Sequence, residues 1–245
     1  MKKAVLCMVG AVVLTSSLVS VRAQQNESAV AAPLTAAERE KHTEEKHAKP
    51  ILDALQLKDA EKEAKLRPIL AAHFKALNAW HDQNDAQIKA LWGEFDKARS
   101  AKSDAGADAA LEKIDGVYAS FKPEHEKFDR ELSTILTPEQ VETVKDAMTI
   151  NKVKITFNAY GEIFPGLTDE HKAFILRNLK AAREEAIDAG SMPEKSAFFK
   201  KYKIKIEAYL NTHGFDVKES YRVFVAKQKA EQDAKKAAAP AEEKK

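Results

Sequence analysis

Residues 59–99 read DAEKEAKLRPILAAHFKALNAWHDQNDAQIKALWGEFDKAR, and this stretch decides the fold class. Its large apolar side chains recur every three or four residues, with one wider gap after Trp80: Leu66, Ile69, Leu70, Phe74, Leu77, Trp80, Ile88, Leu91, Trp92 and Phe95. That spacing places them along one face of an α-helix. The stretch therefore predicts one long helix, with Pro68 as an early kink or restart.

A second run of apolar residues follows with the same period: Leu111, Ile114, Val117, Tyr118, Phe121, Phe128, Leu132 and Ile135. Pro123 lies inside this run and predicts a second kink. Residues 103–107 form the turn between the two runs. Because long helices joined by a short connection usually pack side by side in opposite directions, we expect an antiparallel pair.

Shorter helices are predicted over the rest of the chain. Their apolar positions are Val141, Val144 and Met148; Phe174, Ile175, Leu179, Ala182, Ala186 and Ile187; Phe198, Phe199, Tyr202, Ile206, Tyr209 and Leu210; and Tyr221, Phe224 and Val225. Gly190 and Gly214 close the second and third of these helices. The sequence therefore predicts an all-α fold, a multi-helix bundle with long kinked antiparallel helices.

Several helix starts share one pattern, in which a threonine N-cap follows a leucine. Thr35 and Thr137 are followed three residues later by Glu38 and Gln140, which can complete a capping box. Thr168 is followed at the same distance by a histidine, which fits that place less well.

Residues 152–157 are the exception to the helical pattern. Val153, Ile155 and Phe157 alternate with polar residues, as in a strand. No second strand is available to pair with this segment, and an unpaired strand leaves its backbone groups without partners. We therefore expect an extended or irregular link, with a short strand as the alternative.

The N-terminal residues 1–23 have the pattern of a cleavable signal peptide. Lys2 and Lys3 precede an apolar run, and Ala23 provides a small residue at the expected cleavage point. The run is shorter than the roughly 20 residues that span a bilayer, so no membrane span is expected after cleavage. We predict a periplasmic or secreted protein, and the single cysteine, Cys7, would leave with the signal peptide.

The rest of the chain divides by composition. Residues 24–33 form a predicted linker, and residues 227–245 have a charged, alanine-rich composition typical of a frayed helix end and a disordered tail. A single helical domain is predicted over 34–226. It would contain two sub-bundles, at about 34–136 and 137–226.

Composition and motifs exclude several classes of function. The formal net charge of the whole chain is +2, with both signs interspersed, which does not fit a nucleic-acid-binding protein. The sequence has no G-x-S-x-G motif and no glycine-rich phosphate loop, so no cofactor is predicted. On the long helix, His81, Asp82 and Asp85 can help to hold a cation, but an ordinary exposed face is the preferred interpretation, and no metal site is predicted.

Two groups of residues remain as candidates for chemistry. Glu184 and Asp188 lie four residues apart on one helix face beside Arg183, so they can act as acid and base if they are buried together. The alternative is an exposed acidic stripe neutralised by Arg183 and nearby lysines. Residues 198–203 with Lys195 and Tyr209 combine aromatic rings and cations that can bind sugars, acids or phosphates. The alternative is a core stripe with outward-pointing lysines.

Segments of the C-terminal half resemble a known family. The stretches VKDAMT (144–149), AREEAIDAGS (182–191) and KYK (201–203), with Tyr160 and Tyr209-Leu210, are similar over about 140–217 to a bacterial exported family that is catalogued as a domain of unknown function. The resemblance implies no activity, but it marks polar positions as candidate binding residues: Lys145, Asp146, Tyr160, Arg183, Glu184, Asp188, Lys201 and Lys203. The chain departs from the family pattern at Glu207-Ala208.

A weaker local likeness involves residues 136–140, LTPEQ, which match the LTxxQ motif of periplasmic helical chaperones. Taken together, the sequence predicts an exported helical protein that binds a protein or a cell-envelope polysaccharide without catalysis. Two alternatives stay open. One is a carbohydrate-active hydrolase or lyase that uses Glu184 and Asp188, and the other is a chaperone-like periplasmic holdase.

Overall fold

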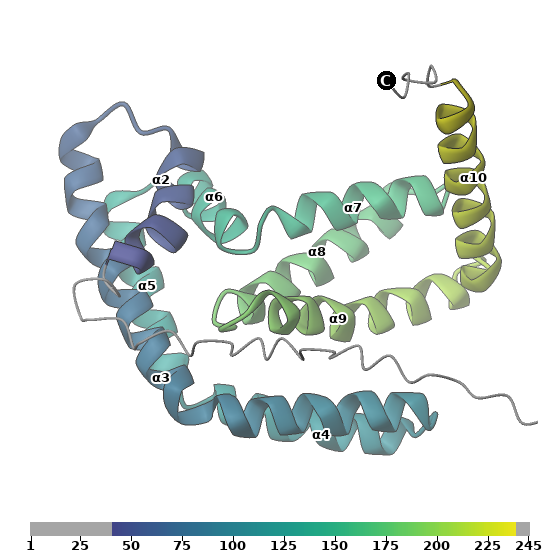
Figure 1. Ribbon diagram of the computed structural model, residues 1–245, viewed down its shortest axis with the longest axis horizontal. Coiled ribbons are helices and arrows are strands. Elements are labelled where there is room, and N and C mark those ends of the chain that lie inside the picture. Colours follow the sequence, from purple (N-terminus) through teal and green to yellow (C-terminus); the bar gives the residue numbers. More distant parts are fainter. Residues whose placement is uncertain (1–40, 239–245) are drawn as a thin grey trace, which may run out of the picture. The chain divides into compact units, whose positions relative to one another are not determined.

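The computed structural model describes residues 41–238, and every regular element in that range is a helix (Figure 1). The elements are η1 (Glu44–Ala48), α2 (Lys49–Leu55), α3 (Ala60–Ser100), α4 (Asp104–Tyr118), α5 (Lys122–Ile135), α6 (Pro138–Met148), α7 (Lys152–Ile163), α8 (Asp169–Ala186), α9 (Met192–Thr212) and α10 (Val217–Ala238). The predicted all-α class is confirmed. The predicted signal peptide and linker lie outside the described residues.

The helix starts follow the local chemistry of the sequence. Thr137 accepts a hydrogen bond from the Gln140 N–H at 3.4 Å, and the Gln140 side chain accepts one from the Thr137 N–H at 3.1 Å, which completes the predicted capping box. His171 also completes a box, because its Nδ1 accepts a hydrogen bond from the Thr168 N–H at 3.2 Å. The expectation that a histidine fits this place less well was wrong. An unprotonated imidazole nitrogen is an acceptor, as a glutamine oxygen is.

The expectation of an extended link at 152–157 was also wrong, because helix α7 begins at Lys152. Val153, Tyr160 and Ile163 are buried on its inner face, whereas the side chain of Ile155 is 60% exposed. The apolar alternation of 153–157 is therefore the first turn of a helical period that continues to Ile163. Asn151 takes a left-handed conformation, with φ 52°, in the turn that separates α6 from α7.

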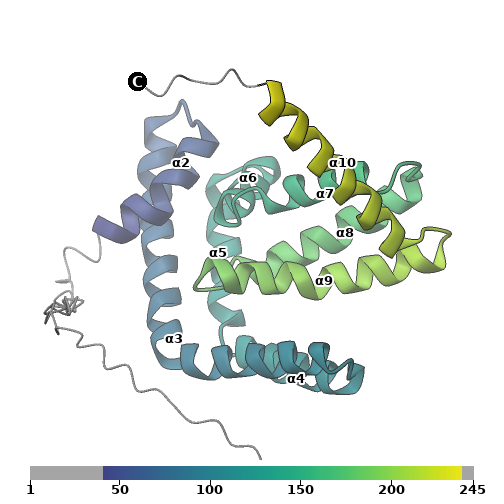
Figure 2. The same ribbon diagram turned by 45° about the vertical axis from the view of Figure 1, so that its right-hand side comes forward.

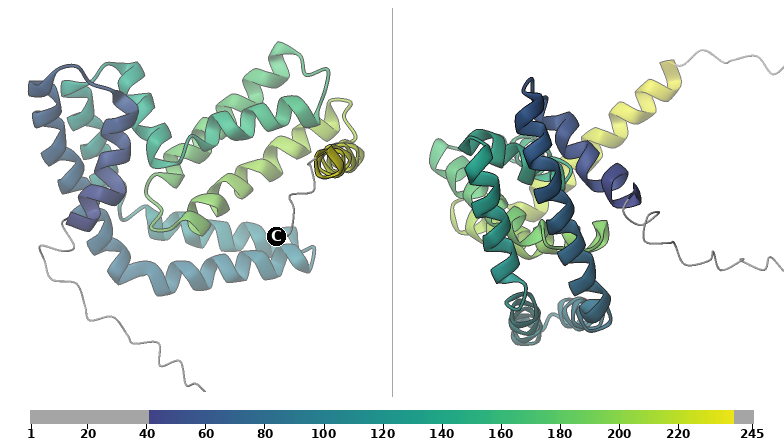
Figure 3. Two further views of the ribbon diagram at one scale, coloured as in Figure 1. Left: turned by 45° about the horizontal axis from the view of Figure 1, so that its top comes forward. Right: turned by 90° about the vertical axis from the view of Figure 1, so that its left-hand side faces the viewer.

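The long helix α3 continues through Pro68 without a break and serves two cores. At about 1.5 Å per residue, its length is about 60 Å. The structure places α3 beside α5, and the last part of α3 turns so that it is seen nearly end-on (Figure 3, right). Pro123 lies in the first turn of α5, so the second predicted helix is two helices, both packed on α3.

Two clusters of buried apolar residues hold the helices together. The first core contains Ala48, Ile51, Leu52, Leu66, Leu70, Phe74, Leu77, Phe121, Phe128, Leu132, Leu136, Val144, Met148 and Ile187. The second core takes Ile88, Leu91, Trp92 and Phe95 from the later part of α3 and joins them to α4, α7, α8 and α9. Trp80 packs against both cores, at the wider gap of the sequence pattern.

Each core combines helices from both predicted sub-bundles, 34–136 and 137–226. Helix α6 packs with α2 and α5, before the predicted boundary, while α4 shares the second core with α7, α8 and α9. Helix α8 packs against α7 and α9, and α10 contacts α7 and α9 (Figure 2). Helix α10 continues to Ala238 and so includes part of the segment 227–245, predicted as a frayed helix end and a disordered tail. None of the described helices is long and apolar enough to cross a membrane.

Candidate functional site

Arg183 is the most deeply buried charged residue among the predicted site residues, with only 1% of its side chain exposed. Its Nη1 donates to Asp146 at 2.7 Å, and its Nη2 donates to Glu142 at 2.7 Å. Nη2 also donates to the neighbouring Glu184 at 3.1 Å. Burial alone lowers the pKa of Arg183, but these hydrogen bonds outweigh burial and raise the pKa above its usual value. Arg183 therefore stays charged and ties α8 to α6.

Lys145 makes the second buried link. Its Nζ donates to Glu184 at 2.6 Å and to Asp129 at 2.9 Å, and 9% of the Lys145 side chain is exposed. Burial lowers the pKa of Lys145, but the two carboxylates outweigh burial and raise the pKa. A single ammonium group therefore connects three helices, because Lys145 lies on α6, Asp129 on α5 and Glu184 on α8.

His125 extends the arrangement to Asp188, which follows the C-terminus of α8. Its Nδ1 lies 2.8 Å from Asp188 Oδ2, and its Nε2 lies 3.6 Å from Asp129 Oδ2. The two carboxylates, Asp129 and Asp188, raise the pKa of His125 to about 10, so the ring is an imidazolium at neutral pH. Burial raises the pKa of Asp188, whereas His125 and Lys145 hold the pKa of Asp129 below its usual range despite its burial.

These residues form one polar network, defined as His125, Asp129, Glu142, Lys145, Asp146, Arg183, Glu184 and Asp188. Each cation in it faces at least two carboxylates, and each carboxylate faces a cation. The charges are thus paired within the network, although Asp129 Oδ1, Arg183 Nε and Asp188 Oδ1 are buried without a hydrogen-bond partner. The shallow depression at η1, α2 and α3, of about 250 Å³, and the open one beside α3 and α4, of about 400 Å³, are lined by other residues.

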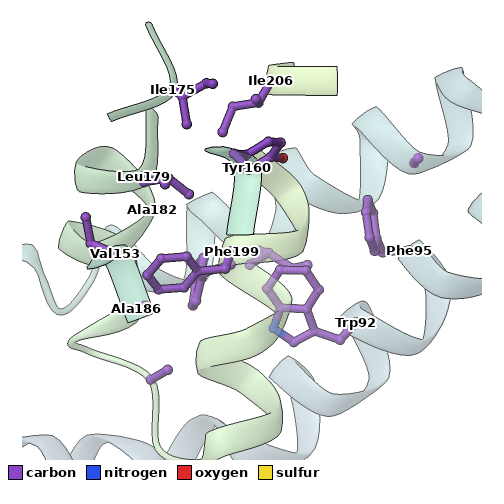
Figure 4. Packing of buried hydrophobic residues seen from close by; sticks show 14 of the residues in the cluster. Trp92, Phe95, Val153, Tyr160, Ile175, Leu179, Ala182, Ala186, Phe199 and Ile206 are labelled. Atoms are coloured by element: carbon purple, nitrogen blue, oxygen red, sulfur yellow. The ribbon is translucent and has the colours of Figure 1, made fainter. Parts of the chain in front are cut away.

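Three predicted site residues lie outside the network. Tyr160 is 2% exposed and belongs to the second core (Figure 4), where Ile175, Leu179 and Ile206 are also found. It packs in a stacked arrangement on Phe164, with the ring centroids 5.7 Å apart. Tyr160 therefore packs in the core and lies apart from the network, so its role as a binding residue stays a prediction.

Lys201 and Lys203 lie on α9 and have partners of their own. Lys201 donates to Asp115 at 2.8 Å and to Glu185 at 2.9 Å, which ties α9 to α4 and α8. The Nζ of Lys203 lies 4.6 Å from the centre of the Tyr221 ring. Of the predicted site residues, Lys145, Asp146, Arg183, Glu184 and Asp188 lie in the polar network, and the other three lie elsewhere.

Comparison with known protein families identifies the family of this chain. Residues 41–230 match the family described as "Protein of unknown function (DUF3826)". The chain belongs to the DUF3826 family. The predicted resemblance to a family of unknown function is confirmed over a longer range than the motifs at 140–217 had indicated. Comparison with the curated proteins finds no match.

Sequence reasoning missed three members of the polar network in this DUF3826 domain: His125, Asp129 and Glu142. His125 and Asp129 lie four residues apart on α5 and share a helix face, which was the available signal. Their partners are Lys145 on α6 and Asp188 in the turn after α8, so no local pattern connects them. The donor atoms of His125, Asp129 and Glu184 lie within 4.8 Å of one another, but the Lys145 ammonium already bonds the two carboxylates. A metal ion would have to displace it.

A second feature of the DUF3826 domain is an aromatic surface on α8 and α9, defined as His171, Phe174, Arg177, Tyr209 and His213. The rings of Phe174 and Tyr209 stack with centroids 3.7 Å apart, and those of Tyr209 and His213 stack at 3.9 Å. The Arg177 guanidinium lies 5.4 Å from the centre of the Phe174 ring. All five side chains are partly or fully exposed. The predicted stripe of 198–209 is thus divided, because Phe198, Phe199 and Ile206 are core residues.

Proposed function

We propose that the chain is exported and binds a cell-envelope polysaccharide, without catalysis, through the aromatic surface of α8 and α9. The observation that carries this proposal is the continuous stack of Arg177, Phe174, Tyr209 and His213 at the protein surface. A sugar ring presents C–H groups on its faces and hydroxyl groups at its edge. Phe174 and His213 cover the two faces of Tyr209, so the stack offers such a ligand the outer face of the His213 ring and the ring edges with their polar tips.

The charges around the stack suit the same ligand class. Arg177 provides a guanidinium that donates in one plane, and His171 and His213 provide ring nitrogens that can donate or accept. His171 lies edge-on to Tyr209, with centroids 6.0 Å apart. Helices α8 and α9 pack along each other, so the rings keep their places before a ligand arrives. Preformed rings reduce the entropy that is lost on binding.

The ion pairs of the polar network support a function without catalysis. An acid–base pair must reach a substrate, directly or through one water molecule. Glu184 instead bonds Arg183 and Lys145, and Asp188 bonds His125. These contacts fit the interpretation of Glu184 and Asp188 as neutralised acids that hold helices together.

The holdase alternative has less support. The exposed large apolar side chains of the described residues are Ile150, Ile155, Leu176, Met192, Val223 and Val225, and they come from four helices and one turn. A holdase that captures unfolded clients needs a contiguous apolar patch. Scattered apolar side chains are an ordinary feature of a protein surface.

Affinity electrophoresis tests the proposal. The purified chain is run through gels that contain soluble envelope or plant polysaccharides, and its mobility is compared with that in a plain gel. We expect at least one polysaccharide to retard the chain. Tyr209→Ala and His213→Ala are expected to remove the retardation, since both lose a ring of the stack. His42→Ala is the matched control, because His42 is an exposed histidine on another part of the chain.

Three results would refute the proposal. The first is normal mobility of the chain in every polysaccharide gel. The second is retardation that Tyr209→Ala leaves unchanged while circular dichroism shows a folded variant. The third is release of reducing sugar from any of these polysaccharides that Glu184→Gln abolishes, which would make the chain a hydrolase or lyase.

A further inference from the structure

His81 lies on α3, is 5% exposed, and both of its ring nitrogens face oxygen atoms. Nε2 lies 2.8 Å from the backbone carbonyl oxygen of Asp188, and Nδ1 lies 2.6 Å from Asp85 Oδ1. A carbonyl oxygen can only accept, so Nε2 carries a proton and donates it. An ionised carboxylate also only accepts. Nδ1 therefore needs either a second proton or a cation shared with Asp85.

Glu194, in the first turn of α9, completes a group of three. One donor atom from each of His81, Asp85 and Glu194 lies within 4.8 Å of the other two. The Glu194 carboxylate is fixed by two donors, the Tyr118 hydroxyl and the Gly190 N–H, the latter at 2.8 Å. Among the described residues, no lysine or arginine nitrogen lies within salt-bridge distance of Asp85 or Glu194.

We propose that His81 Nδ1, Asp85 and Glu194 bind a divalent transition-metal ion of the Zn²⁺ or Mn²⁺ type. One imidazole nitrogen and two carboxylates are ligands that such ions accept, and a dication balances the two negative charges. Metal-binding histidines characteristically donate their other N–H to a backbone carbonyl or a carboxylate, as His81 does to Asp188. Three protein ligands leave a position for water or a further ligand.

The polar network provides a built-in comparison. His125, Asp129 and Glu184 also bring an imidazole and two carboxylates within 4.8 Å. In that group the Lys145 ammonium bonds both carboxylates, so the chain itself supplies the positive charge. At His81 the two carboxylates have no such neighbour among the described residues. The two groups have the same ligand types, but among the described residues no lysine or arginine forms an ion pair with the His81 group. Lys195, whose charge acts on Glu194, donates instead to the carbonyl oxygens of Ala186 and Ile187.

The His81 group can reach metal geometry with a small movement of one side chain. Ligands that bind a tetrahedral ion at about 2.0–2.1 Å lie about 3.3 Å apart. Asp85 must therefore retreat from its 2.6 Å contact with Nδ1. The Asp85 side chain is 67% exposed and free to do so, whereas the His81 side chain is 6% exposed and stays in place.

Gly190 packs closely against the His81 ring. A Cβ atom at position 190 would lie 2.8 Å from His81 Nδ1, closer than real Cβ atoms approach such an atom. The backbone of Gly190 also donates to Glu194. The absence of a side chain at Gly190 therefore allows His81 Nδ1 and the Glu194 carboxylate to lie close to the backbone of Gly190. Gly190→Ala is expected to displace Nδ1.

The experiment is a metal titration of the purified chain, made without a histidine tag and freed of metal with a chelator. Trp80 reports binding by its fluorescence, because its ring centre lies 4.9 Å from that of His81. Isothermal calorimetry gives the stoichiometry. We expect one Zn²⁺ or Mn²⁺ per chain and a higher melting temperature with metal. Mg²⁺ is expected to bind much more weakly, since it prefers oxygen ligands.

Single carboxylate variants test whether the metal binds at this group of residues. Asp85→Asn is expected to weaken binding at least tenfold and to leave the fold intact, because Asp85 is exposed. Asp82→Asn is the matched control, as its side chain is exposed on the same helix outside the group, and it should bind as the unchanged chain does. Glu194→Gln is expected to weaken binding as Asp85→Asn does. Absence of one-to-one binding at millimolar metal would overturn the proposal, and so would equal affinities of Asp82→Asn and Asp85→Asn.

Discussion

Replacement of Arg183 by methionine is the sharpest test of the polar network. Methionine fills a similar volume but removes the charge and the donors, so Asp146, Glu142 and Glu184 lose a shared partner. Removing one partner of a buried ion pair usually costs about 3–5 kcal/mol, because it leaves the opposite charge buried without compensation. The Arg183 side chain is 1% exposed, which puts it in this class.

The structure places the expected cost at the lower end of that range. Glu142 keeps its bond to Lys180, and Glu184 keeps its bond to Lys145. Only Asp146 loses its partner outright, and its side chain is 32% exposed, so water offsets part of the loss. We therefore expect Arg183→Met to lower the free energy of unfolding by about 3 kcal/mol.

Urea unfolding followed by circular dichroism measures this change. For a chain of this size, each kcal/mol lowers the melting temperature by about 2–4 °C, so a thermal melt should shift by about 6–12 °C. Lys180→Met is the matched control, because Lys180 bonds the same Glu142 from a side chain that is 48% exposed. An exposed pair is worth about 1 kcal/mol or less. If Arg183→Met costs no more than Lys180→Met, the network does not hold the helices together.

Three further predictions concern single groups. The pKa of His125 is raised from 6.5 to about 10 in the folded chain. Its contribution to stability is therefore complete below pH 6.5 and is lost as the pH rises towards 10. The difference in unfolding free energy between the wild-type chain and His125→Gln should shrink over that range. Burial lowers the pKa of Lys195 to about 8, so Lys195 changes the stability in the opposite direction as the pH rises. The wild-type chain and His125→Gln must therefore be compared with each other at each pH. His171→Ala should cost about 1 kcal/mol through loss of the capping box, while His171→Gln should cost much less, as urea unfolding would show. Gly190→Ala should lower the melting temperature, because its Cβ meets the His81 ring, and an unchanged melt would contradict that contact.

The helices of this chain were largely predictable because each long helix buries one face. The apolar period of 59–99 is long enough to exclude a strand, and the threonine caps mark the starts of α6 and α8. The failure at 152–157 has the opposite cause. Three alternating apolar residues fit a strand and a helix equally well, and only Tyr160 and Ile163, beyond that window, continue the helical period.

The candidate site was predictable only in part. Lys145, Arg183 and Glu184 came from motif resemblance, and their convergence follows from the packing of α6 on α8. His125 and Asp129 reach the same place from α5, and that contact is set by the first core rather than by any nearby sequence pattern. Tyr160 shows the converse case, since a motif position can lie in the core, away from the other polar motif residues.

The two histidine groups show most clearly what a linear pattern cannot express. Each places a carboxylate four residues after a histidine, His81 with Asp85 and His125 with Asp129, so the sequence presents them as equivalents. They differ only in the residues that distant helices bring to them. Lys145 supplies a cation to the His125 group, and a closed ion-pair network results. Glu194 supplies a second carboxylate to the His81 group, which adds negative charge where positive charge is required. If the Asp85 pair were merely structural, Glu194→Gln would change the melting temperature of the metal-free chain, through its contacts with Tyr118 and Gly190, without affecting metal affinity. For a metal site it must also weaken metal binding, so the two measurements on one variant separate the two roles.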